Sequence, residues 1–74
     1  MQIIIHRVSQ EIVMDVNEWN TVLEVKQQIY EKEGIPIHHQ ILIFSGKQLE
    51  NDQPVCKYGI QTDANIYLVV CLYV

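Results

Sequence analysis

The sequence predicts an α+β fold in which a β-sheet packs against one amphipathic helix, and three observations support this prediction. Residues 21–34 have the apolar spacing of a helix, with signals for its beginning and its end. Short β-branched runs with the length of strands stand before and after it. Of the 74 residues, 49% are hydrophobic and 19% charged, so the chain can bury one core but has no room for a second. We therefore expect residues 1–74 to form a single domain.

The chain opens with a predicted β-hairpin. Residues 1–6 and residues 12–16 are both rich in β-branched side chains, and the polar break Ser9-Gln10-Glu11 separates them. The break lacks Gly, Asn and Asp at its centre, so the type of turn stays open. Alternation along the two strands gives one wholly apolar face that can receive the helix. This face consists of Ile3, Ile5, Ile12, Met14 and Val16.

The helix has clear start and stop signals. Thr21 can accept a hydrogen bond from the first free backbone amides, and Glu24, three residues on, completes a capping box. The apolar stripe at helical spacing consists of Val22, Val25 and Ile29. Gly34 belongs to the residue type that most readily takes the left-handed backbone at a helix end, and Pro36 prevents continuation.

A strongly apolar strand follows the helix. The run Ile41-Leu42-Ile43-Phe44 has the length and branching of a strand, and Ser45-Gly46 marks a turn after it. Leu49 then offers one buried anchor in a short strand or extended turn.

The last third of the chain is predicted to end in a central strand. Residues 51–54 form a loop by composition, and residues 55–60 form a short helical turn that ends at Gly59 with a positive φ. Residues 66–72 are apolar on both faces, as is usual for a strand that lies in the middle of its sheet or that uses one side for binding.

Charge and hydropathy exclude two classes of partner. A net charge of -4 provides no basic stripe for phosphate backbones, so nucleic acid is not an expected partner. Residues 1–7 lack the order of a signal peptide, and the nine apolar residues 66–74 are too few to cross a bilayer as a helix. We expect no membrane contact and a location in the cytoplasm, the nucleus or both.

Metal sites, cofactor sites and catalytic constellations are not expected either. The two cysteines, Cys56 and Cys71, have no zinc-ligand spacing and are too few for a disulfide framework. His38 and His39 are adjacent, so their side chains point apart on most backbones. Three glycines are too few for an obvious phosphate loop. We therefore predict no enzyme, no cofactor and no metal.

The order of elements and several motifs resemble the ubiquitin family. The motifs occur in the same order over essentially the whole chain, with a single deletion in the first hairpin turn: Met1-Gln2-Ile3, Lys32-Glu33-Gly34-Ile35-Pro36, Leu42-Ile43-Phe44-Ser45-Gly46-Lys47-Gln48-Leu49-Glu50, Tyr58-Gly59-Ile60-Gln61 and Leu68-Val69. The resemblance implies the β-grasp fold, a mixed sheet of about four to five strands curled around one helix. It also implies a hydrogen bond between the Tyr58 hydroxyl and the backbone near Glu50. The implied core is Ile3, Ile5, Ile12, Met14, Val16, Val22, Val25, Ile29, Leu42, Leu49, Val55, Ile60, Ile66 and Leu68.

The resemblance also implies a partner-binding face on the outer side of the sheet. Ubiquitin's partners mostly dock on an exposed apolar patch, and the matching positions here are Val8, Ile43, Gly46, Tyr67 and Val69. Ile43 is expected to be the central anchor. Alternation adds Ile41 and Cys71 to the same surface. Exposed apolar surface of this extent is uncommon unless something binds it, and a partner helix would suit it. The alternative is that this face packs against the rest of a longer parent chain or a second copy.

The end of the chain departs from ubiquitin's pattern. Ubiquitin ends in an arginine-rich tail with two glycines, whereas the stretch here is Val70-Cys71-Leu72-Tyr73-Val74. Ile41 and Cys71 replace arginines that ubiquitin presents to its activating enzyme. We therefore expect the N-terminal module of a longer protein, one that binds ubiquitin-binding proteins or proteasome receptors noncovalently. The alternative is a covalent modifier whose mature diglycine terminus lies beyond residue 74. Lys47 matches a chain-forming lysine of ubiquitin and is a candidate acceptor.

Overall fold

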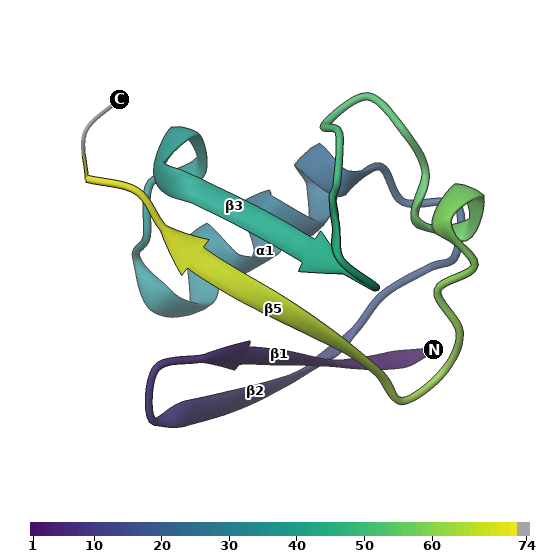
Figure 1. Ribbon diagram of the computed structural model, residues 1–74, viewed down its shortest axis with the longest axis horizontal. Helices are drawn as coiled ribbons and strands as arrows, with labels where there is room; N and C mark the ends of the chain where they lie inside the picture. Colours follow the sequence, from purple (N-terminus) through teal and green to yellow (C-terminus); the bar gives the residue numbers. More distant parts are fainter. Residues whose placement is uncertain (73–74) are drawn as a thin grey trace.

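The computed structural model (Figure 1) describes residues 1–72, so the part of the predicted tail at Tyr73 and Val74 lies outside the described residues. The elements in chain order are β1 (Gln2–Arg7), β2 (Gln10–Asp15), α1 (Val22–Glu33), η1 (Ile37–His39), β3 (Gln40–Phe44), β4 (Lys47–Gln48), η2 (Val55–Tyr58) and β5 (Ala64–Val70). The strands form a 5-stranded sheet in the order β2-β1-β5-β3-β4. β1 and β5 pair in parallel and the other neighbours are antiparallel, so the predicted mixed sheet beside one helix is confirmed.

α1 begins and ends where the sequence predicts. The Thr21 hydroxyl accepts from the Glu24 backbone N–H at 3.2 Å, and the Glu24 carboxylate accepts from the Thr21 N–H at 2.8 Å, which completes the capping box. Gly34 takes a left-handed φ of 74°, and its N–H donates to the Tyr30 carbonyl at 2.8 Å. The capped helix lies against one face of the sheet (Figure 1).

The core lies between α1 and the sheet face that it covers. Every core residue named from the sequence is buried, and Ile35 joins the same cluster. Ile35 was not predicted because it stands in the short loop between Gly34 and Pro36, outside the periodicity of both helix and strand. The core therefore extends under the loop that leaves the helix.

A buried glutamine ties the helix to the sheet. The Gln40 side chain is 3% exposed, and its Nε2 donates to the Lys26 carbonyl at 3.0 Å and to the Ile35 carbonyl at 2.9 Å. Buried backbone carbonyls need such donors. Gln40 therefore holds the first residue of β3 against α1 and the loop that follows α1.

Two predicted boundaries are wrong. The first hairpin turns at Val8 and Ser9, because Arg7 pairs with Gln10 and the predicted polar break is largely part of β2. The edge strand β2 tolerates polar residues because its outer face is exposed to solvent. The last strand covers Ala64–Val70, not residues 66–72. It ends there because Val70 pairs with Gln40, the first residue of β3.

The region between β4 and β5 follows the prediction. η2 (Val55–Tyr58) ends at Gly59, which has a φ of 73°. The Glu50 backbone N–H donates to the Tyr58 hydroxyl at 2.9 Å, which confirms the hydrogen bond implied by the resemblance. Leu49 is buried in the core as expected. No helix within residues 1–72 is long and apolar enough to span a membrane.

Candidate protein-binding face

Four side chains of β3 and β5 form an apolar surface, hereafter the sheet face: Ile41, Ile43, Tyr67 and Val69. In the antiparallel register Ile41 opposes Val69 and Ile43 opposes Tyr67, so the four are neighbours on two adjacent strands. The pair between them, Leu42 and Leu68, is buried in the core. Because neighbouring residues of a strand point to opposite faces, the four side chains of the sheet face point away from α1. Tyr67 is 55% exposed and Val69 is 46% exposed.

His6 of β1 continues the sheet face at one side. It pairs with Tyr67 in the parallel register, and the two rings stack with centroids 5.1 Å apart and planes 25° apart. The His6 Nε2 lies 2.7 Å from the Asn65 Oδ1, and its Nδ1 lies 3.5 Å from a Glu11 carboxylate oxygen. Each ring nitrogen of His6 therefore faces an acceptor oxygen. Sequence reasoning missed His6, although alternation from the buried Ile5 places it on the outer side of β1.

Val8 lies at the tip of the first hairpin. Its side chain is 92% exposed, and it borders a shallow hollow together with Val69 and Val70. The structure therefore places Val8 beside the sheet face, at the end of the hairpin that joins β1 and β2.

Gly46 and Lys47 lie at the tight turn between β3 and β4. Ser45 and Gly46 both have positive φ values, 55° and 78°, the combination found in two-residue hairpin turns. A side-chain carbon at Gly46 would meet no other atom within 4 Å, so its backbone is open to approach. Lys47 is exposed and borders a separate hollow with Lys57 and Tyr58. Its amine is accessible from solvent.

Cys71 lies beyond the end of the strand that was predicted to carry it. The alternation that assigned it to the sheet face assumed a strand over residues 66–72, and β5 ends at Val70. The Cys71 backbone N–H still donates to the His39 carbonyl at 2.7 Å, and its side chain is partly buried. Cys71 therefore adjoins the end of the sheet face without belonging to its paired strands.

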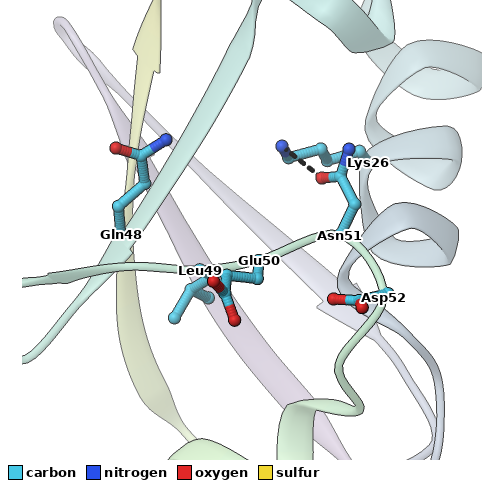
Figure 2. Close-up of a pocket in the computed structure, with 6 residues that line it drawn as sticks. All are labelled: Lys26, Gln48, Leu49, Glu50, Asn51 and Asp52. Carbon is cyan, nitrogen blue, oxygen red and sulfur yellow. Dashed lines mark hydrogen bonds between the residues drawn. The ribbon is translucent and has the colours of Figure 1, made fainter.

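A polar hollow lies between α1 and the loop after β4 (Figure 2), and it contains none of the predicted site residues. Lys26 is 7% exposed, and its Nζ donates to the Asn51 Oδ1 at 2.6 Å. In Figure 2 the carboxylates of Glu50 and Asp52 lie on the other side of the loop backbone from this amine. Burial lowers the pKa of Lys26 below its ordinary value. The acceptor for the buried Lys26 amine is thus the uncharged side-chain amide of Asn51, which does not offset the cost of burying the charge.

This burial predicts that stability rises with pH in the alkaline range. The folded protein holds the Lys26 proton less tightly than the unfolded chain does, because the folded-state pKa is lowered. Burial of the charged Lys26 amine therefore destabilises the folded protein, and this effect is fully present below the folded-state pKa. It disappears as pH rises toward the ordinary lysine value of about 10.4. Urea unfolding measured between neutral pH and about pH 10 should show an increase in the free energy of unfolding from this residue.

Asn51→Asp isolates this contribution. The substitution places a carboxylate where the Lys26 Nζ now finds an amide oxygen at 2.6 Å, so it should raise the pKa of Lys26 and flatten the pH dependence. Gln48→Glu is the matched control, because it adds the same charge in the same hollow at a position without a hydrogen bond to Lys26. Ionisation of cysteines and tyrosines is common to all three proteins. Identical slopes for the three would contradict the assignment to Lys26.

The described residues contain no cluster of side chains suited to binding a metal ion. Within residues 1–72 no group of three or more His, Cys, Asp or Glu side chains could hold a metal ion. The His38 and His39 rings meet edge to face with centroids 4.4 Å apart, in the η1 turn.

Comparison with known proteins relates the chain to one family. The model of the ubiquitin family matches residues 4–72. Ubiquitin-like protein NEDD8 of Dictyostelium discoideum is 38% identical over 63 residues, which cover 85% of this chain and 82% of that protein. Ubiquitin domain-containing protein DSK2 of Saccharomyces cerevisiae is 46% identical over 50 residues, 68% of this chain and 13% of that protein. E3 ubiquitin-protein ligase UPL5 of Arabidopsis thaliana is 34% identical over 71 residues, 93% of this chain and 8% of that protein.

Proposed function

The chain belongs to the ubiquitin family, and from this premise we propose that it is a noncovalent binding module that engages ubiquitin-recognising partners through the sheet face. One observation carries the proposal: the apolar side chains of β3 and β5 are contiguous, and Tyr67 and Val69 are open to solvent. A soluble protein rarely leaves such a surface uncovered unless a partner binds there. The proposed partners are ubiquitin-binding proteins or proteasome receptors.

A partner helix fits this surface better than an extended strand. The sheet face lies on β3 and β5, which pair with each other, and β5 has β1 on its other side. A partner that lies across these strands therefore contacts their side chains. Ile43 is the proposed anchor, and Val8, Tyr67 and Val69 are its flanks. Gly46 is the proposed point where the partner approaches the backbone, because no atom crowds its position.

Two relatives that are much longer than this chain support the proposal that it is a module within a longer protein. The matches to DSK2 and UPL5 cover small parts of those chains, and DSK2 is named as a protein that contains a ubiquitin domain. We propose by analogy that this chain is the N-terminal module of a longer protein of the ubiquitin system in the cytoplasm or nucleus. This role is one of binding and includes no catalysis.

A covalent modifier is the second candidate. The match to the NEDD8 protein covers 82% of that relative, which is therefore close to this chain in length. The residues Val70–Val74 weigh against conjugation, because they carry neither the arginines nor the diglycine of ubiquitin's tail. A reading frame that closes with a diglycine shortly after residue 74 would favour the modifier, and several hundred further residues would favour the module. Lys47 stays a candidate acceptor in either case.

A titration followed by NMR tests the proposal. The ¹⁵N-labelled protein is titrated with a ubiquitin-interacting helix. The amide shifts should concentrate on the sheet face and Gly46. Ile43→Ala should weaken binding at least about tenfold, since a central apolar anchor is worth more than about 1.4 kcal/mol. The variant should still unfold cooperatively.

Leu23→Ala is the matched control for this experiment. It removes the same number of side-chain carbon atoms from an exposed position of α1, on the other side of the sheet, and should leave the affinity unchanged. Undiminished binding by Ile43→Ala would refute the assignment of this face. An absence of shifts in a monomeric protein would refute the proposed class of partner.

A further inference from the structure

The loop between β2 and α1 presents the chain's single tryptophan to solvent. Trp19 is 70% exposed, although indole is among the largest apolar side chains. It borders one hollow with Met1, Asn17 and Glu18, and none of the sheet-face residues lines this hollow. Trp19 therefore belongs to a surface distinct from the sheet face.

Hydrogen bonds hold this loop in one conformation. The Asn20 N–H donates to the Asn17 carbonyl at 2.9 Å, which closes a four-residue turn with Glu18 and Trp19 at its corners. The Trp19 N–H donates to the Asn17 Oδ1 at 2.9 Å, and the Asn17 N–H donates to the Asn20 Oδ1 at 2.8 Å. The Cys56 N–H donates to the Glu18 carbonyl at 3.0 Å, which fixes the turn to η2. A ligand at this turn would meet a loop that is already ordered, which lowers the entropy cost of binding.

The charges around the hollow favour a cationic ligand. Glu18 is exposed next to Trp19, and the protein carries a net charge of -4. The Met1 ammonium also lies here, but it donates to the Val16 carbonyl at 2.8 Å and lies 3.3 Å from an Asp15 carboxylate oxygen. Its positive charge is therefore paired. The indole ring and the Glu18 carboxylate remain as the groups on this hollow that attract a cation.

We propose that Trp19 and Glu18 form a binding site for an arginine side chain of a partner polypeptide. A guanidinium group can stack flat on an indole face while its N–H groups donate to a carboxylate. A lysine ammonium is a compact, strongly hydrated charge and cannot stack in this way. This site is independent of the proposed function, because it shares no residue with the sheet face. Since the site is open and takes one side chain, a short peptide should bind it with a dissociation constant on the order of 1 mM.

The single tryptophan makes the site directly measurable. The probe is the tripeptide acetyl-Gly-Arg-Gly-amide, and its matched control carries citrulline, which has nearly the same shape without the charge. Binding of the arginine peptide should change Trp19 emission and shift the amide signals of residues 17–20. The citrulline peptide should bind at least about fivefold more weakly, because it offers no charge to the indole or the carboxylate.

Single substitutions test whether Glu18 and Trp19, and no neighbouring groups, carry the arginine binding. Glu18→Gln should weaken arginine binding about three- to tenfold, and Trp19→Ala should abolish the amide shifts. Glu31→Gln should change little, because it removes the same charge from a separate hollow. Ile43→Ala should leave this binding intact. Equal affinity for the two peptides, or amide shifts that persist in folded Trp19→Ala, would overturn the proposal.

Discussion

Ile29→Ala should lower the free energy of unfolding by about 2–5 kcal/mol. The Ile29 side chain is fully buried on the stripe of α1 that faces the sheet. Truncation removes apolar contacts and leaves a cavity that a close-packed interior fills only in part. A small domain has about 5–15 kcal/mol in total, so this one change would remove a large share of it.

Urea unfolding followed by circular dichroism measures this effect. Leu23→Ala is the control, because Leu23 lies on the same helix with a 43% exposed side chain and should cost less than about 1 kcal/mol. Isoleucine favours a helix less than leucine does, so the gain in propensity on substitution by alanine is larger at Ile29 and does not explain a larger loss of stability there. A loss below 1 kcal/mol at Ile29 would mean that the helix and sheet close the cavity.

Gln40→Met should cost about 2 kcal/mol or more. Methionine has a similar length and keeps the apolar contacts of the side chain, but it cannot donate to the carbonyls of Lys26 and Ile35. A buried acceptor that loses its donor costs about 1–3 kcal/mol, and the Ile35 carbonyl stands outside any helix that could supply another donor. The substitution therefore tests whether these two hydrogen bonds hold β3 to α1.

Gln48→Met is the matched control for this prediction. Gln48 lies exposed on β4, so the same chemical change there should stay within about 0.5 kcal/mol of the parent protein. Equal stability of the Gln40 and Gln48 variants would show that the two hydrogen bonds do no more than offset the burial of the Gln40 Oε1, which has no hydrogen-bond partner within residues 1–72.

Most of the fold could be predicted because apolar periodicity and capping signals are local. The capping box at Thr21 and the left-handed Gly34 follow from a few adjacent residues, and the structure confirms both. Burial of polar residues could not be predicted in this way. Lys26 and Gln40 are polar by type, and only the path of neighbouring segments provides them with buried partners. Ile35 was missed for the same reason, since a loop residue has no period to reveal its direction.

The sheet face likewise has features that follow from local sequence and features that depend on distant segments. Alternation within β3 and β5 predicts which side chains share a side, and the register brings Ile43 and Tyr67 together as expected. Its use as a binding surface stays a prediction. The stacking of His6 on Tyr67 joins residues far apart in the sequence and depends on the parallel pairing of β1 with β5. Trp19 was missed because its exposure depends on hydrogen bonds that fix its loop to η2.

The parallel pairing of β1 with β5 also affects when the protein can fold during synthesis. Ile5 of the first strand lies opposite Ile66 of the last strand, so the centre of the sheet joins the two ends of the domain. Local elements such as α1 form early, but pairing across such a sequence distance must wait until both strands are free to meet. β5 lies between β1 and β3, and a nascent chain that still has β5 inside the ribosome therefore exposes two unpaired strand edges. Folding is completed only after Val70 has left the exit tunnel.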